Sequence, residues 1–171
     1  MTINIRPCQL DQLSLLRDVS IETYRDTFEE SNSEALMQQY LDDALTEEKL
    51  SQQLQTVGSY FYFIYFADQV AGFLKVNIDA AQSDDVAKDS LEIERFYIRK
   101  LFLRNGLGNK LMQFAYNLGQ EFGKSAVWLG VWEHNVPALA FYHAHGFQQV
   151  GEHPFDMAGD LQTDLLLKRE L

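Results

Sequence analysis

The chain has 171 residues, 46% of them hydrophobic and 13% aromatic, which is enough for one packed domain and short for two. Its net charge of −11, from 14 basic and 25 acidic residues, argues against a protein that binds nucleic acid through the phosphates. The lone Cys8 excludes an internal disulfide, and the sequence has no signal peptide and no apolar run of about 18 residues. We therefore expect a cytoplasmic protein without a membrane segment.

The first half of the chain predicts a strand, three helices and a β-hairpin. Pro7 ends the first strand, and Ser33 and Thr46 are placed as N-caps of the second and third helices. Asp68 and Gln69 form the expected turn between two strands rich in aromatic and β-branched residues. In chain order, the elements are a strand at 3–8, helices at 10–24, 33–45 and 46–54, and strands at 59–66 and 70–78.

The second half, after an acidic loop, predicts four strands and two helices. In its first strand Leu91 and Ile93 share one face, and Glu92 and Glu94 share the other. Asn135 caps the second helix. The strands are expected at 91–98, 125–132, 147–153 and 162–168, and the helices at 106–123 and 135–146. This order predicts an α+β, or mixed α/β, fold with one central sheet.

A glycine-rich loop leads from the strand at 91–98 into the next helix. The unpaired N–H groups and the dipole at a helix start favour a phosphate group. Gly106 and Gly108 lack the Cβ atoms that would keep a ligand away. Five basic residues and no acidic one lie from Arg95 to Lys110, which predicts a basic patch at the loop. The loop alone fits an ordinary helix start as well, and Leu111 excludes the G-x-G-x-x-G motif.

Two motifs resemble those of the GNAT superfamily of acetyl-CoA-dependent N-acetyltransferases. The pattern Q/R-x-x-G-x-G/A matches residues 103–108 except at Leu103, where Gln or Arg is usual. The pattern N-x-x-A-x-x-F-Y-x-x-x-G-F matches at every fixed place, namely Asn135, Ala138, Phe141, Tyr142, Gly146 and Phe147. The resemblance implies one N-acetyltransferase domain over residues 1–171. It also implies a mostly antiparallel central sheet flanked by helices, with splayed central strands that bind acetyl-CoA.

Further stretches look like the PaiA-type polyamine N-acetyltransferases of bacteria. They are residues 20–33, 90–98, 128–135 and 162–171. This resemblance implies direct acetyl transfer to the primary amine of a small molecule, namely spermidine or spermine, with no nucleic-acid partner. Two alternatives stay open: an enzyme that acetylates a protein N-terminus or lysine, and a non-catalytic module that binds acetyl-CoA. Whether the chain forms a homodimer also stays open.

The resemblance places the cofactor contacts in two stretches, and no metal is expected. In the first stretch the strand is expected to be bulged beside the cofactor, which frees backbone amides for the pantetheine and acetyl groups. These contacts fall to Phe96, Tyr97 and Ile98. The pyrophosphate falls to the amides of Arg104, Asn105, Gly106, Leu107, Gly108 and Asn109. By the same resemblance, Asn135 and Tyr142 complete the cofactor site.

Acetyl transfer to an amine needs a base, because the amine arrives protonated, and benefits from an acid at the leaving thiolate. Glu94, immediately before the expected bulge, is the first candidate for the base, and Glu92 is the second. Both also fit the role of surface carboxylates on a solvated sheet face, and Glu92 fits that role better than Glu94 does. Tyr142 is the expected acid, since a phenol can donate a proton without being ionised beforehand.

Acidic residues are concentrated in the first half of the chain. Residues 1–90 hold 16 acidic and 6 basic residues. By the resemblance, these segments wall the acceptor side, so they would attract a polycation, and salt would weaken the attraction. The acids concerned are Glu22, Asp26, Glu29, Glu30, Glu34, Asp84, Asp85 and Asp89.

Overall fold

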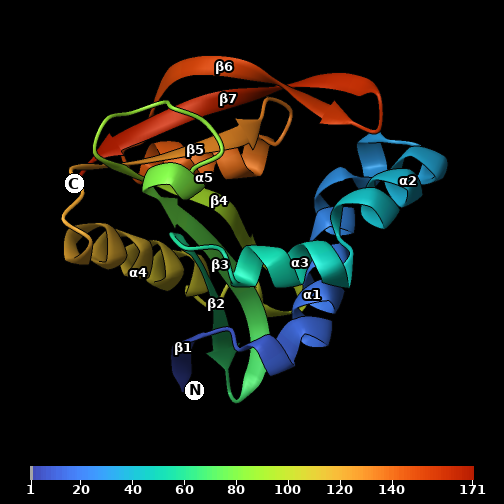
Figure 1. Cartoon of the computed structure of the whole chain (residues 1–171), viewed down its shortest axis with the longest axis horizontal. Coiled ribbons are helices and arrows are strands. Elements are labelled where there is room, and N and C mark those ends of the chain that lie inside the picture. The colour runs from blue at the N-terminus through green and yellow to red at the C-terminus, as the bar shows by residue number, and fades with distance from the viewer. Residues whose placement is uncertain (1) are drawn as a thin grey trace.

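The computed structural model describes residues 2–171, and its strands form one seven-stranded sheet (Figure 1). The strands are β1 (Ile3–Pro7), β2 (Ser59–Phe66), β3 (Gln69–Ile78), β4 (Ser90–Ile98), β5 (Ala126–Trp132), β6 (Gln148–Met157) and β7 (Asp160–Glu170). They lie in the order β1-β2-β3-β4-β5-β7-β6. β4 and β5 are parallel, and the other neighbours are antiparallel.

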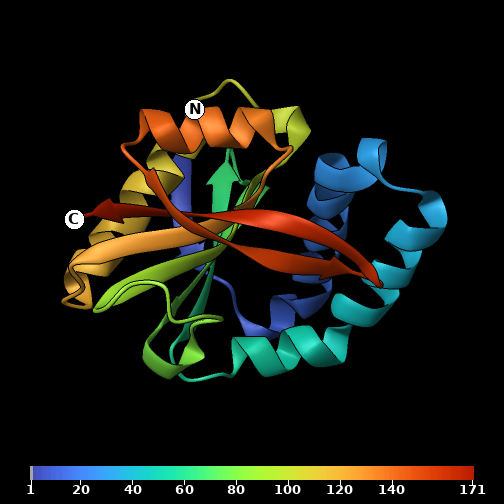
Figure 2. The same cartoon turned by 90° about the horizontal axis from the view of Figure 1, so that it is seen from above.

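Helices flank both faces of this sheet. They are α1 (Leu13–Phe28), α2 (Glu34–Ala44), α3 (Glu47–Leu54), α4 (Leu107–Glu121) and α5 (Val136–Ala144), with 3₁₀ turns at Leu10–Gln12, Glu29–Ser31, Asp79–Ala81 and Lys100–Phe102. The first three helices pack on one face, and α4 and α5 pack on the other (Figures 1 and 2). Over residues 2–171, no helix is both long enough and apolar enough to cross a membrane. The predicted mixed fold, with a mostly antiparallel sheet between helices, is confirmed.

The three predicted helix caps are present. The Ser33 hydroxyl accepts a hydrogen bond from the backbone N–H of Leu36 at 3.1 Å, and the Thr46 hydroxyl accepts one from Lys49 at 3.2 Å. The Asn135 side chain accepts one from the N–H of residue 138 at 3.3 Å. Each cap satisfies a helix N–H that would otherwise lack a partner, so these helices begin where the sequence predicts.

Both hairpins depart from the predicted bounds. The turn between β2 and β3 is formed by Ala67 and Asp68, one residue earlier than predicted, with φ of 48° and 66°. Two consecutive residues with positive φ match the twist of a two-residue hairpin, so Gln69 is free to start β3. The last hairpin is longer than predicted. β6 continues to Met157, and β7 begins at Asp160.

A hydrophobic core lies on each side of the sheet. Under α4 and α5 it contains fully buried side chains such as Leu107, Leu111 and Phe147. Under α1, α2 and α3 it is built around Leu16, Met37, Leu50, Phe63 and Phe73. Because a strand alternates its side chains between the two faces, the central strands contribute to both cores.

β4 contains a β-bulge at Glu94. Lys75 of β3 pairs with Arg95, and the next residue of β3 pairs with Ile93, so Glu94 is left without a partner. The extra residue shifts the alternation of side chains, and Ile93 and Phe96 therefore pack in the same core although they are three positions apart. The expected bulge is present, but it lies at Glu94 itself, two residues before the stretch Phe96–Ile98 that was assigned to the cofactor.

The two parallel central strands separate after the bulge begins. β4 pairs with β5 only over Ser90–Ile93, opposite residues 126–129. Beyond these pairs, β4 continues to Ile98 and β5 to Trp132. The backbone edges that face the resulting gap therefore have no strand partner.

Gly72 sets how closely β3 and β4 approach at the end of β4. A Cβ atom at this position would lie 2.2 Å from the backbone oxygen of Tyr97. We expect Gly72→Ala to lower the free energy of unfolding in urea by about 3 kcal/mol, because backbone must move to admit the methyl group. Gly151→Ala is the control, since its Cβ would meet Leu166 at an ordinary 3.6 Å. Equal stabilities of the two variants would contradict the prediction.

Candidate active site

A cavity of about 710 Å³ opens at the gap between β4 and β5. Its wall includes the glycine-rich loop, residues 103–109, so we call it the loop cavity. All but one of the residues predicted to bind the cofactor line it. They are Phe96, Tyr97, Ile98, Arg104, Gly106, Leu107, Gly108, Asn109, Asn135 and Tyr142. The exception is Asn105, whose side chain donates to the backbone oxygen of Phe102 at 3.0 Å.

Glycine is suited to the two positions of the loop for different physical reasons. Gly106 precedes α4 with φ of 72°, and a Cβ there would meet nothing within 4 Å. Gly108 has ordinary helical geometry, but its Cβ would lie 3.2 Å from the ring of Phe141. The loop backbone thus faces open space at Gly106, whereas Gly108 lets α4 pack closely on α5.

The predicted basic patch is divided by the fold. Arg99 pairs with Glu22 at 2.7 Å on the side of α1, and Arg95 lies outside the loop cavity. Lys100 and Arg104 are the basic residues that line this cavity. The predicted patch of five cations is therefore only partly present at this cavity, because Arg95 lies on β4 and lines a different cavity, whereas Lys100 and Arg104 lie in the connection that follows β4.

A second cavity, of about 580 Å³, lies between β4, α1, α2 and the β6–β7 hairpin, and we call it the hairpin cavity. The hairpin extends to the α1–α2 connection (Figures 1 and 2), where Gln162 donates to the side chain of Asn32 at 2.9 Å. The two cavities share part of their walls, including Tyr97, Trp132 and Tyr142. They therefore meet at the gap between the central strands.

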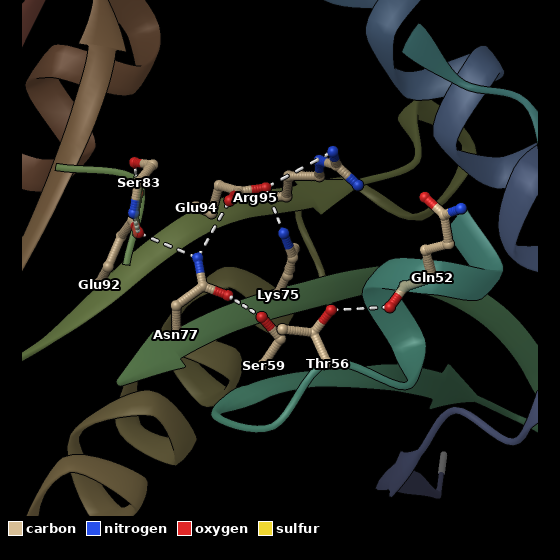
Figure 3. A network of polar contacts seen from close by, with 9 residues as sticks. All are labelled: Gln52, Thr56, Ser59, Lys75, Asn77, Ser83, Glu92, Glu94 and Arg95. Carbon is tan, nitrogen blue, oxygen red and sulfur yellow. Dashed lines mark hydrogen bonds and ion pairs between the residues drawn. The ribbon is translucent and has the colours of Figure 1, made fainter. Parts of the chain in front are cut away.

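Glu92 and Glu94 line the hairpin cavity within a polar network (Figure 3). Lys75 donates to Glu94 at 2.6 Å, and the Asn77 amide donates to Glu94 at 3.0 Å and to Glu92 at 2.9 Å. The backbone N–H of Ser83 donates to Glu92 at 2.8 Å, and its hydroxyl also donates to this carboxylate. Glu92 is only 3% exposed. Neither residue is a solvated surface carboxylate.

The network gives its two carboxylates opposite pKa shifts. For Glu92, burial dominates over the hydrogen bonds and raises the pKa above the ordinary value. For Glu94, burial also tends to raise the pKa. The positive charges of Arg95 and Lys75 outweigh this effect, so the pKa is lowered. Burial lowers the pKa of Lys75 in turn. Glu94 is therefore ionised and ion-paired at neutral pH.

Tyr142 reaches both cavities from α5. Its ring packs edge-on against Phe96, with centroids 6.2 Å apart, and against Phe147 at 5.8 Å. Burial is the main reason why its pKa is raised, and the nearby Tyr97 adds to the effect. The hydrogen bonds found over residues 2–171 include none to its hydroxyl. Tyr142 thus presents a neutral phenol at the junction of the cavities.

The acids predicted to wall the acceptor side are distributed over both cavities and the surface. Asp26 and Glu30 line the loop cavity, and Glu22 and Glu34 are paired with arginines. The carboxylates that line the hairpin cavity are Asp84, Glu92, Glu94 and Asp164. The sequence analysis missed Asp164. The available signal was a carboxylate directly before the apolar run Leu165–Leu167 of an expected strand. Residues 2–171 contain no group of three or more His, Cys, Asp or Glu suited to a metal ion.

Comparison with known proteins identifies the family. The family model described as the acetyltransferase (GNAT) family matches residues 20–147. The chain therefore belongs to this family, and its enzyme class is N-acetyltransferase.

Individual relatives cover nearly the whole chain. An uncharacterized N-acetyltransferase of Lactobacillus delbrueckii subsp. lactis is 46% identical over 90% of this chain and 88% of its own length. A spermine/spermidine N(1)-acetyltransferase of Bacillus subtilis is 24% identical over 91% of this chain and 94% of its own. Among solved structures, PaiA N-acetyltransferase from Thermoplasma acidophilum in complex with coenzyme A matches with a TM-score of 0.82. That match has 20% identity and covers both chains fully, so it concerns the fold.

The ion pairs of Glu94 predict an acid-sensitive contribution to stability. Since the folded state lowers the pKa of Glu94 from its usual 4.5, this contribution is complete above that value and is lost as the pH falls below it. We expect the free energy of unfolding of the wild type to fall between about pH 5 and pH 3, and part of this slope to disappear in Glu94→Gln.

The matched control is Glu121→Gln, at the exposed end of α4. It should keep the slope of the wild type. Urea unfolding across this pH range measures the slope of each variant. An unchanged slope in Glu94→Gln would show that the ion pairs of Glu94 do not contribute to the loss of stability in acid.

Proposed function

We propose that this chain transfers the acetyl group of acetyl-CoA directly to a primary amine of a polyamine such as spermidine or spermine. We propose further that residues 1–171 form a single catalytic domain. The observation that carries the proposal is that two cavities, with different linings, meet at Tyr142 in the gap between β4 and β5. A two-substrate transfer needs such a junction, where the two reacting groups are held in contact.

The loop cavity fits acetyl-CoA in three respects. The first N–H groups of α4 have no helical partner and suit the pyrophosphate, and the backbone at Gly106 faces open space. Arg104 of the loop lines the cavity and supplies a positive charge next to the helix start, whereas the charge of Lys100 is offset by Asp26 at 3.7 Å. The free edge of β4 at Phe96–Ile98 suits an extended pantetheine, and the Asn135 side chain lies on the same wall. Bound acetyl-CoA supplies an activated thioester carbonyl.

In this proposal, β4 and α5 provide the groups that act on the reacting atoms. Backbone N–H groups of β4 beyond the bulge polarise the carbonyl. Glu94 takes the proton of the amine through water, and Glu92 holds Glu94 in place through their shared partner Asn77. Tyr142 donates a proton to the departing thiolate, in keeping with a raised pKa that keeps its phenol protonated.

Two observations favour a polyamine as the acceptor. Four carboxylates line the hairpin cavity, and they give it a net negative lining that attracts cations. The Bacillus subtilis relative named above, and a 24% identical relative from Thermoplasma acidophilum, are named for polyamine acetylation.

An amine panel tests the proposed function. We expect release of coenzyme A thiol from acetyl-CoA with spermidine, at a higher kcat/KM than with n-butylamine. A peptide with a free N-terminus should give little release. Preference for the peptide would point to a protein acetyltransferase. Binding of acetyl-CoA without thiol release from any amine would point to a non-catalytic module.

Tyr142→Phe tests whether Tyr142 donates the proton to the departing thiolate. The variant keeps the ring that packs on Phe96 and Phe147, so acetyl-CoA affinity should be unchanged while kcat falls about 10²-fold. Tyr116→Phe is the matched control, because this residue is equally buried but lines neither cavity. Steady-state kinetics with calorimetric binding of acetyl-CoA decides between the outcomes. A kcat equal to that of the wild type would leave Tyr142 with a packing role alone.

A further inference from the structure

The carboxylate of Asp164 differs from the other carboxylates of the hairpin cavity. Glu92 and Glu94 each accept hydrogen bonds from neighbouring side chains, and Asp84 lies 3.2 Å from His153. Over residues 2–171, no side chain or backbone group donates a hydrogen bond to Asp164, and the nearest basic nitrogen is Nε2 of His153 at 3.9 Å. The side chain of Asp164 is nevertheless only 19% exposed. A carboxylate that is largely buried and has no hydrogen bond lacks the compensation such groups normally have.

Aromatic side chains form a continuous wall of the same cavity. Trp132 lies 5.1 Å from Phe28, which lies 6.2 Å from Phe155, measured between ring centroids. Phe155 in turn lies 6.1 Å from Tyr40, which stacks on Tyr24 at 4.4 Å. All five residues line the hairpin cavity with Asp164. Aromatic faces beside a carboxylate are suited to alkylammonium groups, through cation–π attraction and a charged hydrogen bond.

Three residues that line this cavity also carry buried polar atoms without a hydrogen-bond partner among residues 2–171. These atoms are the hydroxyls of Ser20 and Tyr24 and the indole N–H of Trp132, on side chains that are 3%, 7% and 7% exposed. Buried polar atoms usually have a partner, so three without one make this side of the cavity unusually polar for an aromatic wall.

We propose that Asp164, with the aromatic wall of Tyr24, Phe28, Tyr40, Trp132 and Phe155, binds a second, non-reacting ammonium group of the acceptor. This inference rests on the proposed function and adds which residues bind the nitrogen of the polyamine that does not react. The reacting nitrogen lies at the junction of the cavities, and the second lies against β7.

The strand order gives the scale of the distance between Glu94, the proposed base, and Asp164. Glu94 belongs to β4 and Asp164 to β7, and these strands lie on either side of β5. Two strand spacings amount to about 10 Å, and the separation of β4 from β5 adds to this distance. An extended polyamine places successive nitrogens about 5 to 6 Å apart, so the two outer nitrogens of spermidine are separated by roughly the distance between these strands.

Asp164→Asn removes the charge and keeps the shape of the side chain. We expect kcat/KM for spermidine to fall at least about 10-fold through KM, because an ammonium in a buried pocket loses its ion pair. With n-butylamine, which has a single nitrogen, kcat/KM should change less than about twofold, and acetyl-CoA affinity should stay unchanged. Asp164→Glu, which keeps the charge, should retain part of the preference for spermidine.

Two further variants keep the proposal testable if Asp164→Asn does not fold. Glu152→Gln removes an exposed carboxylate of the same hairpin outside both cavities, and it should behave as the wild type. Phe155→Leu removes one ring of the wall, and it should raise KM for spermidine about threefold without affecting n-butylamine. Equal losses for both amines in Asp164→Asn and Phe155→Leu would overturn the proposal, and so would unchanged spermidine kinetics.

Calorimetry of spermidine separates this inference from the proposed function, because binding needs no acetyl transfer. Binding to the wild type that is weakened at least about 10-fold by Asp164→Asn supports the ammonium site even if no amine releases thiol. Transfer to n-butylamine without detectable spermidine binding would overturn the ammonium site and leave the acetyltransferase proposal standing. Absence of both transfer and binding would overturn both.

Discussion

The parallel pairing of β4 with β5 ends at Ile93 and Leu129, and the candidate site depends on this early ending. A sheet that stayed paired to the ends of both strands would have no room for a ligand between them and no free backbone groups to bind one. The bulge at Glu94 adds a residue to β4 at the place where the pairing ends. Bulges bend the strand that carries them, so the bulge gives a local reason for the separation.

The charged side chains around the bulge favour one conformation of this part of the sheet. Lys75 is 4% exposed and is neutralised by Glu94, which itself contacts Arg95 at 3.5 Å. Removal of one partner from a buried ion pair leaves an uncompensated charge, which costs several kcal/mol, whereas the intact pair contributes little net stability. The network therefore favours one arrangement of β3 against β4 over others, and Asn77 extends it to Glu92 through a side chain that contacts both carboxylates. Its main effect is on specificity of structure rather than on the total stability.

Local patterns predicted the elements well and the site in part. Ser33, Thr46 and Asn135 marked helix starts because an N-cap is formed within four residues of sequence. The glycine-rich loop and Tyr142 were found because their motifs are also contiguous in sequence. The basic patch was predicted only in part, because it depends on the directions of side chains and not on a contiguous motif. Whether Arg95 and Arg104 face the same cavity depends on the direction of a bulged strand, which residue spacing does not reveal.

Asp164 shows the limit of sequence reasoning most clearly. Its position opposite Trp132 follows from the pairing of β7 with β5, and its neighbours Tyr24 and Tyr40 come from helices more than 100 residues earlier. The same hairpin that brings Asp164 to the cavity also covers it, because Gln162 and Phe155 contact the segment from α1 to α2. The hairpin cavity is thus assembled from both ends of the chain, whereas the loop cavity draws much of its wall from residues 96–142. Changes in the first and last elements can therefore alter the cavity proposed for the acceptor while the glycine-rich loop stays the same.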